Sequence, residues 1–395
     1  MSNSVEGLLS ALSAEGQKLA INEPGSREKT IMQARRLIAT LETPMEALLQ
    51  IIWAEPTRYA VIRLALDLKV FETLAEDSRR PKTLAELCVP RNADVALVRR
   101  LARHLAATGV ITEAGRELYV ATPLAKSLIE PDFAAGVIAL FDTTHNVFAV
   151  MPSYFDAKNW KNPIDDQDGP FQHAHGPING FTWLNQNPKV MEAFVSYMFR
   201  QRRERPSWVD PGFYPIKDRL IEGVAAAGDA SAIVDVGGAV GLCLVELQTK
   251  VPEWKGRLIL QEQESVTSQI KGLDPRIEIQ THDFFQPQPV KGARAYYLRD
   301  ILHNWPNDRC RLILTRLKDA MTLGYSKVLL NECVVADEGA SWQHTSLDMY
   351  MMSFQAAEER TETQWRDLIE SVGLEVTGIW AKGEGNEAII EITRH

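Results

Sequence analysis

A short glycine-rich segment constrains the fold of this chain most strongly. Residues 232–247 read A-I-V-D-V-G-G-A-V-G-L-C-L-V-E-L, an apolar run that leads into a turn with three glycines and then into a helical pattern. This order is typical of a strand, a tight loop and a helix. Glycines allow positive φ angles and lack the Cβ atoms that would keep a ligand away from the backbone. Ordinary strand–helix turns carry the same pattern, but the unpaired N–H groups of the following helix favour a site for a nucleotide-like cofactor.

Polar side chains end each of the strands predicted after this segment. The strand at 258–260 leads into Gln261 and Glu262, and an acid there can accept hydrogen bonds from both hydroxyls of a ribose. Three further predicted strands, at 277–280, 293–298 and 327–330, run into His282-Asp283-Phe284, Arg299 to Trp305, and Asn331-Glu332. Parallel strands bring their carboxyl ends to one edge of a sheet. We therefore predict an α/β fold with a cofactor site at that edge.

Taken together, these motifs resemble those of class I S-adenosylmethionine-dependent O-methyltransferases of the plant caffeate type and their fungal relatives. The matching motifs are V-D-V-G-G-x-x-G at 234–241, L-R-x-I-L-H-x-W at 298–305 and E-E-R-T at 358–361, with an acid after the second strand and Asp-Phe after the third. The resemblance covers the chain beyond about residue 45. It implies a Rossmann-like methyltransferase sheet, parallel with one antiparallel edge strand, plus an N-terminal all-helical or winged-helix dimerisation domain.

The resemblance also implies S-adenosyl-L-methionine as the cofactor and assigns roles to individual residues. His303 matches the general base that deprotonates a substrate hydroxyl, and Glu332 and Glu359 match the two carboxylates that flank this base. We expect Glu332 to hold the imidazole in the correct tautomer and to stabilise the imidazolium. The predicted cofactor-binding residues are Asp235, Gly237, Gly238, Gly241, Glu262, Asp283, Phe284 and Arg299.

A second enzymatic function remains open. Ala239 stands where the family usually has a third loop glycine, and Asn304 stands where an aspartate commonly follows the catalytic histidine. Some fungal relatives with this fold resemble methyltransferases but act as pericyclases, which keep the cofactor bound and use its positive charge to polarise a substrate carbonyl. Arg299-Asp300 resembles the Arg-Asp pair of the leporin-type pericyclase. The alternative is therefore a dehydration or Diels–Alder-type cyclisation in which Arg299 and His145 polarise the substrate.

The first 125 residues predict a helical arm and a winged helix. Apolar residues recur at helical spacing over 5–20 and 28–50, and a second subunit is a candidate to cover such stripes. Helices are predicted at 59–74, from Thr83 onward and at 95–108, followed by a hairpin that turns at Ala114-Gly115. In the family that the chain resembles, this module serves dimerisation, so we expect a homodimer.

The remaining chain divides into a helical substrate-pocket segment, 126–228, and a Rossmann-like cofactor-binding catalytic domain, 229–395. The pocket segment is rich in aromatic and histidine residues, including His145, which is typical of an apolar pocket with few polar groups. Many of these rings must also be ordinary core. At the C-terminus, a helix at 362–372 precedes strands at 375–381 and 386–393, which predict an antiparallel hairpin around Lys382 to Gly385.

Charge and cysteine usage exclude several classes of partner. A net charge of −9 argues against nucleic acid, because phosphate binding normally needs a basic surface. The winged helix could otherwise suggest a DNA-binding regulator. No run of about 18 apolar residues and no signal-peptide pattern are present, so we expect a cytoplasmic protein without a membrane partner. Neither a metal site nor disulfides are expected, because the cysteines are scattered: Cys88, Cys243, Cys310 and Cys333.

The mechanism predicted from these residues is in-line methyl transfer to a hydroxyl of a small, largely apolar secondary metabolite. A phenol or enol is a poor nucleophile at neutral pH, so a base of pKa near 7 within hydrogen-bond reach is useful. His303 has the chemistry for that role. A non-catalytic, ligand-sensing dimer is a third interpretation.

Overall fold

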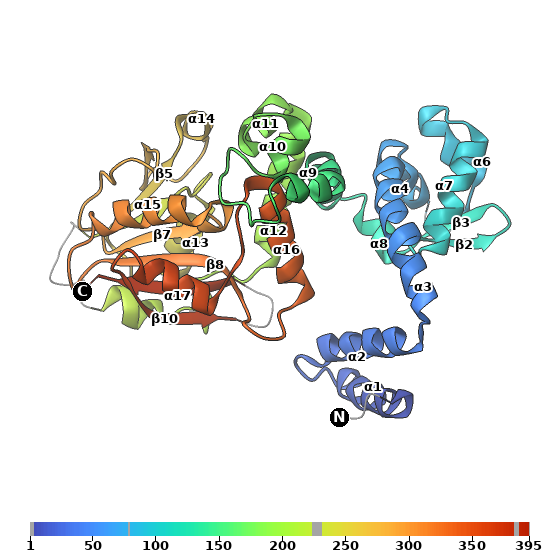
Figure 1. Cartoon of the computed structure of the whole chain (residues 1–395), viewed down its shortest axis with the longest axis horizontal. Coiled ribbons are helices and arrows are strands. Elements are labelled where there is room, and N and C mark those ends of the chain that lie inside the picture. The colour runs from blue at the N-terminus through green and yellow to red at the C-terminus, as the bar shows by residue number, and fades with distance from the viewer. Residues whose placement is uncertain (1–3, 78–79, 223–230, 383–386, 395) are drawn as a thin grey trace. The chain divides into compact units, whose positions relative to one another are not determined.

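The computed structural model describes residues 4–77, 80–222, 231–382 and 387–394. The chain forms two compact units, residues 1–137 and 138–395 (Figure 1). The predicted division at 125 and 228 stays a prediction, and its second boundary lies outside the described residues.

The N-terminal unit begins with a pair of helices, α1 (Val5–Ala20) and α2 (Ser26–Leu41), which pack against each other. The helix predicted over 28–50 is wrong as one element, because it breaks before Pro44. Thr43 caps the next helix, α3 (Pro44–Leu49), through a capping box with Glu46. Proline lacks the N–H that a continuous helix would need, so the chain restarts there. A π-helical turn (Gln50–Ala54) joins α3 to α4 (Glu55–Asp67).

A winged-helix arrangement follows, as predicted. It contains α5 (Val70–Ala75), α6 (Leu84–Cys88), α7 (Val95–Ala107) and a sheet in the order β1 (Lys82–Thr83), β3 (Leu118–Ala121), β2 (Ile111–Gly115). The helix predicted at 59–74 is two helices, because Lys69 takes a left-handed conformation at φ 58°. The hairpin turns at Arg116-Glu117 rather than at Ala114-Gly115, since Gly115 still pairs with Leu118.

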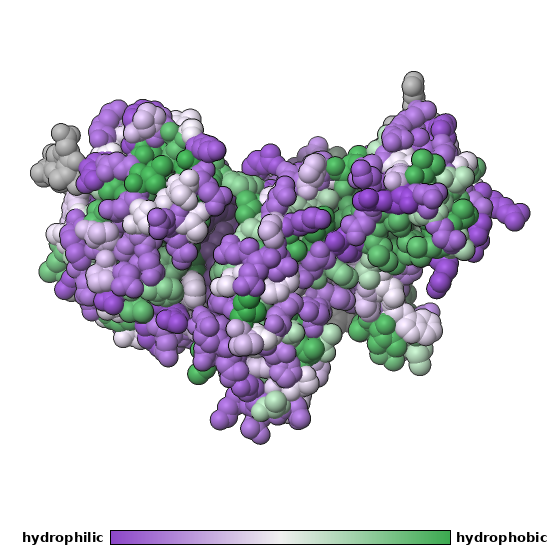
Figure 2. Space-filling model, turned by 90° about the horizontal axis from the view of Figure 1, so that it is seen from above, coloured by the Kyte–Doolittle hydropathy of each residue, from purple (hydrophilic) through white to green (hydrophobic). Residues whose placement is uncertain are grey.

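Many large apolar side chains of this unit are exposed. Figure 2 shows hydrophobic surface among hydrophilic residues on the part of the molecule that Figure 1 assigns to the N-terminal unit. The exposed side chains include Leu9, Ile38, Leu41, Met45, Ile51, Ile52 and Trp53. Soluble monomers rarely expose so much clustered apolar surface, so these helices favour a protein partner.

One described helix, α9 (Pro131–Ala157), is long and apolar enough to cross a membrane. Helix α2 and the segment Pro44–Asp67, bent by 114°, pass the same test only as a pair. Core helices of soluble proteins have the same composition, so these helices carry no membrane assignment. Helix α9 is followed by three further helices: α10 (Pro170–His175), α11 (Gly180–Gln186) and α12 (Pro188–Glu204).

The C-terminal unit is built on one large sheet, which confirms the predicted fold class. Its strands lie in the order β10-β11-β8-β7-β4-β5-β6, and the strands β4 to β8 are parallel. The reversed strand is β11, which lies second from the edge, between β8 and β10, so the prediction of a reversed strand at the edge itself is wrong in its position. The bounds are β4 (Ala232–Val236), β5 (Arg257–Glu262), β6 (Ile277–Thr281), β7 (Ala295–Arg299), β8 (Lys327–Val335), β10 (Glu375–Ala381) and β11 (Glu387–Thr393).

Helices cover both faces of this sheet. On one face, Val234 and Val236 join a core with α15 (Asn307–Lys318) and α17 (Glu362–Glu370). On the other face, Ile233 packs with α13 (Leu242–Lys250) and with residues 208–221. Successive strand residues point to opposite faces, so β4 is buried along its whole length. The predicted turn of the C-terminal hairpin lies almost wholly outside the described residues.

Candidate active site

The glycine loop between β4 and α13, residues 237–241, is the expected site of the cofactor, and we call it the cradle. Gly237 has φ 74°, and its N–H donates to the carbonyl of Gln261 at 2.8 Å. A Cβ on Gly237 would lie 2.7 Å from Cδ1 of Ile301, and one on Gly238 would lie 2.4 Å from the carboxyl of Asp235. Gly241, at φ 83°, is the N-cap of α13. Side chains at these positions would therefore displace the loop, which explains the glycines that the sequence showed.

Two acids border this loop. Ala239 takes a left-handed φ of 50°, and its N–H donates to Oε1 of Glu262 at 3.3 Å. The second oxygen of Glu262 accepts from the N–H of Gln263 at 2.7 Å, while burial raises the pKa of this carboxyl. Asp235 is fully buried, both of its oxygens have no partner in the described part of the chain, and burial raises its pKa to about 7. Because buried polar atoms normally have hydrogen-bond partners, the unpaired carboxyl oxygens of Asp235 favour a hydrogen-bond donor from a bound ligand.

The residues predicted for the adenine lie on the loop after β6. Asp283 is exposed, and its Oδ1 accepts from the N–H of Phe285 at 3.0 Å. Phe284 is partly buried and meets the rings of Phe285 and Trp305 edge-on, at centroid distances of 4.8 and 6.1 Å. The Cβ position of Gly237 is 3.7 Å from Phe284. The structure thus brings Phe284 to the cradle and leaves Asp283 open to solvent.

The turn after β7 carries His303. Asp300 has φ 52°, a conformation that is uncommon for a residue with a Cβ, and a short 3-10 helix (Leu302–Asn304) follows. Nδ1 of His303 lies 2.6 Å from Oε1 of Glu359, which has no exposed side-chain surface. Burial alone would lower the pKa of His303, but the charge and hydrogen bond of Glu359, helped by Glu332 and Asp300, raise it to about 10.

Glu332 makes no hydrogen bond to the imidazole among the described contacts, which corrects the prediction that it holds the tautomer. Its Oε1 accepts from the N–H groups of Ile301 and Leu302, at 3.0 and 2.7 Å. Glu332 leaves β8 facing the backbone of the turn, whereas Glu359 approaches the ring itself. Burial raises the pKa of Glu332 to about 8, and its Oε2 is buried without a partner among the described residues. Glu359 is therefore the residue that fixes the imidazole, and Glu332 fixes the turn.

Arg299 belongs to an ion-pair network that the sequence did not reveal. Its Nε and Nη2 donate to the two oxygens of Glu387 on β11, at 2.8 and 2.6 Å. Arg205, at the end of α12, binds the same carboxylate and lies 4.0 Å from Asp300. The third nitrogen of Arg299, Nη1, is buried and has no partner in the described ranges. Because a strand pairing brings Glu387 here from 88 residues away, no local motif could have indicated it.

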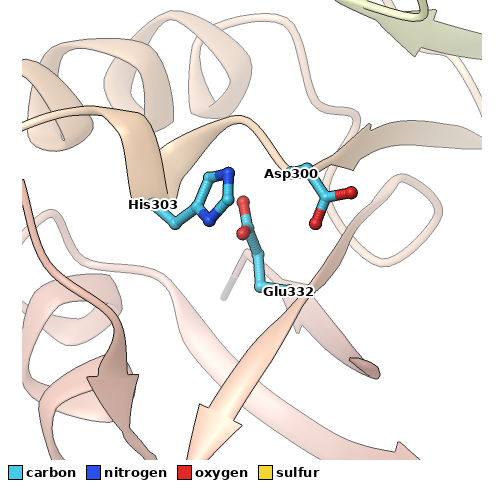
Figure 3. A group of neighbouring side chains, drawn as sticks. All are labelled: Asp300, His303 and Glu332. Carbon is cyan, nitrogen blue, oxygen red and sulfur yellow. The ribbon is translucent and has the colours of Figure 1, made fainter. Parts of the chain in front are cut away.

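Asp300, His303 and Glu332 form the group shown in Figure 3, in which the Glu332 carboxylate lies beside the imidazole. Ligand atoms of the three side chains lie within 4.8 Å of one another, as a metal site would need. Arg299 lies 3.6 Å from the Asp300 carboxylate, and Arg205 also approaches it. Their positive charges oppose a second cation beside Asp300. The expected absence of a metal stays a prediction.

The aromatic segment divides into core and partly exposed rings. Phe171 has no exposed surface and joins Val147, Leu184 and Phe354 in a core cluster. His145 is partly buried on α9, and its ring stacks on Phe141 with centroids 4.6 Å apart. Its substrate role stays a prediction. The structure therefore brings Arg299, His303, Glu332 and Glu359 together at one sheet edge.

Comparison with known proteins relates both parts of the chain to O-methyltransferases. Residues 159–375 match the family profile of the O-methyltransferase domain, and residues 57–131 match the O-methyltransferase dimerisation domain. The chain is 36% identical to O-methyltransferase mpaG of Penicillium brevicompactum, over 97% of each chain. Two solved structures resemble it: a LepI variant in complex with SAH and a substrate analogue, 26% identical with a TM-score of 0.86, and a pericyclic reaction enzyme, 25% identical with a TM-score of 0.84. Each alignment covers 99% of this chain and 100% of the other.

Proposed function

Because the chain belongs to the S-adenosylmethionine-dependent O-methyltransferase family, we propose that it methylates a phenol or enol oxygen of a small, largely apolar secondary metabolite. The observation that carries the proposal is the pairing of His303 with Glu359 next to the glycine loop. Gly237 lies directly against Ile301, two residues before His303. A cofactor on the loop and a substrate on the base would therefore share one site.

The residues at the loop fit the cofactor of this family. The glycines let the loop backbone pack closely against Ile301 and Asp235, and Glu262 ends β5, where a carboxylate can bind ribose hydroxyls. Phe284 offers an apolar ring face beside the cradle, and Arg299 offers an unpaired, buried N–H to an anionic or carbonyl group. When bound, S-adenosylmethionine supplies an electrophilic methyl group on a positively charged sulfur.

His303 serves as the base in this proposal. Glu359 accepts from Nδ1, so Nε2 is the nitrogen that takes the proton from the substrate hydroxyl. The same carboxylate then stabilises the imidazolium. Without a ligand, the surrounding carboxylates keep the pKa of His303 at about 10, so the ring is protonated at neutral pH. A positive charge bound beside it lowers that pKa, because like charges oppose each other. The base would thus become available when the methyl donor is bound.

Aromatic side chains of α9 and α16 (Trp342–Gln355) favour a flat, mostly apolar acceptor. On α9, His145 stacks on Phe141, and Phe148 meets Tyr350 of α16 edge-on at 5.0 Å. Helix α16 also carries methionines, whose flexible side chains adapt to irregular ligand surfaces. Aromatic and sulfur-containing surfaces bind planar rings without fixing many polar contacts. This supports a phenolic or enolic acceptor.

The direct test follows a labelled methyl group. Purified protein is incubated with methyl-labelled S-adenosylmethionine and a panel of phenols and enols, and S-adenosylhomocysteine and methylated product are measured together. We expect the two to form in equal amounts. Failure of every acceptor to take up label, with the cofactor shown to be bound, would contradict the proposal.

A pericyclase is the second candidate function, and a specific observation favours it. Glu387 holds two nitrogens of Arg299 and leaves Nη1 as a buried donor, which suits a carbonyl that gains negative charge. The similarity to a pericyclic reaction enzyme points the same way. In that case the cofactor is required but not consumed over many turnovers, so the labelled-methyl experiment separates the two functions.

We also infer a homodimer as the working assembly. The dimerisation-domain match covers residues 57–131, and the arm before it exposes Ile51, Ile52 and Trp53. Burial of such side chains against a second copy would stabilise the assembly, because each large apolar side chain contributes about 1.5 to 3 kcal/mol when fully buried.

A further inference from the structure

Arg360 is a fully buried arginine that lies directly after Glu359 in the chain. Its guanidinium donates hydrogen bonds to three acceptors in and just after the turn that carries His303. Nη1 donates to the carbonyl of Leu302 at 3.2 Å, and Nη2 donates to the carbonyl of Trp305 at 3.0 Å. Nε donates to Oδ1 of Asn307 at 3.1 Å. Two of these acceptors are backbone groups on either side of His303.

An ordinary structural ion pair does not explain this arginine. Removing a guanidinium from water is costly unless its donors are satisfied, and a buried acid is the usual partner. The nearest carboxylate, Glu358, lies 3.5 Å from Nε, is partly exposed and also accepts from Asn307. The three shortest hydrogen bonds of Arg360 go to the carbonyls of Leu302 and Trp305 and to Oδ1 of Asn307. The guanidinium also lies over the ring of Trp365, 5.1 Å from its centroid, which fixes its plane.

Both the N–H groups and the carbonyls of this turn therefore have buried side-chain partners. Glu332 accepts the N–H groups at its start, and Arg360 donates to the carbonyls of Leu302 and Trp305. The short strand β9 (Arg360–Thr361) pairs with β8 through Val334, two residues beyond Glu332. Glu332, Glu359 and Arg360 thus belong to one connected frame around His303.

We propose that Arg360 is a positioning residue for His303, which sets the place and orientation of the base by fixing the carbonyls of its turn. This rests on the proposed function of His303 as a base. A lysine at the same place keeps the charge but has one donor atom, so it cannot reach both carbonyls with fixed geometry. The turn would then shift relative to Glu359, and a small misplacement of a base lowers the rate strongly.

The chain offers a matched control in Arg294, at the opposite end of β7. Arg294 is also buried, donates to the carbonyls of Leu220 and Tyr325, and lies over an aromatic ring at 5.2 Å. Arg360→Lys and Arg294→Lys therefore remove the same kind of interaction from two places. Both are expected to lower the melting temperature, but only Arg360→Lys should change catalysis.

For Arg360→Lys we expect kcat to fall by about 10- to 100-fold with KM within about twofold, since the lost interaction serves the base and not substrate binding. An NMR titration of the His303 imidazole should show its pKa moving down toward the ordinary value. Asn307→Leu removes one acceptor of Arg360 and should give a smaller change in the same direction.

Three results would overturn the inference. The first is a wild-type kcat and titration in Arg360→Lys, and the second is an equal loss of kcat in Arg294→Lys. If Arg360→Lys does not fold, an unchanged His303 titration in Asn307→Leu is the third. The titration needs no substrate, so it still tests the positioning role if no methyl transfer is found, which separates failure of this inference from failure of the proposed function.

Discussion

Replacement of Glu359 by glutamine gives the sharpest test of the site, because it needs no substrate. Nδ1 of His303 and Oε1 of Glu359 are 2.6 Å apart, and both side chains are nearly or fully buried. A pKa raised from 6.5 to about 10 corresponds to ~5 kcal/mol of preference for the imidazolium. Glu359 is the largest of the groups that raise it, so we assign about half or more of that preference to this carboxylate.

The sign of the pH dependence follows from this raised pKa. The ion pair stabilises the folded protein fully below pH 6.5, and the contribution disappears as the pH rises through about 10. The difference in unfolding free energy between wild type and Glu359→Gln should therefore be largest near pH 6 and shrink by ~2 to 3 kcal/mol toward pH 10.

Urea unfolding followed by tryptophan fluorescence at pH 6, 8 and 10 measures this difference. Glu358→Gln is the control, since that neighbouring carboxylate contacts Asn307 and Arg360 and not the imidazole. Its effect on stability should not vary over the same pH range. A Glu359→Gln effect that is equally constant with pH would refute the reasoning.

Further predictions concern the cofactor, the assembly and the reaction. Gly237→Val should weaken S-adenosylmethionine binding in calorimetry, because a Cβ there meets Ile301 at 2.7 Å, and Glu262→Ala should weaken it by about 1.5 to 3 kcal/mol through lost charge-assisted hydrogen bonds. Unchanged affinity in both variants would exclude this site. Deletion of residues 1–25 should uncover α2 and move the protein toward monomer or aggregate in sedimentation, whereas unaltered sedimentation would show the arm to be dispensable. His303→Ala should lower methyl transfer by about 10²- to 10⁴-fold, with a smaller loss at high pH. If the protein is a pericyclase, Arg299→Ala should instead cost about 3 kcal/mol of barrier, with no S-adenosylhomocysteine formed.

The sequence alone determined the sheet and the loop at its edge. Strands β4, β5, β7 and β8 were predicted because each contains an apolar run with a polar end, and a parallel sheet buried on both faces requires that pattern, whereas the outer strand β6 alternates apolar and polar residues. Gly237, Gly238 and Gly241 were recognisable from their motif, and the structure explains the first two because Ile301 and Asp235 approach their backbone closely. His303 and Glu359 were indicated by their motifs.

Only the tertiary structure decided how the charged groups pair. The family resemblance placed both Glu332 and Glu359 beside His303 and favoured Glu332 as the partner of the imidazole, whereas the hydrogen bonds in the structure assign the ring to Glu359 and the turn to Glu332. The partner of Arg299 comes from a strand 88 residues later, and Arg360 reaches the His303 turn across a strand pairing. Side-chain hydrogen bonds act over a few ångströms in space, and the chain fold alone brings together residues so distant in sequence.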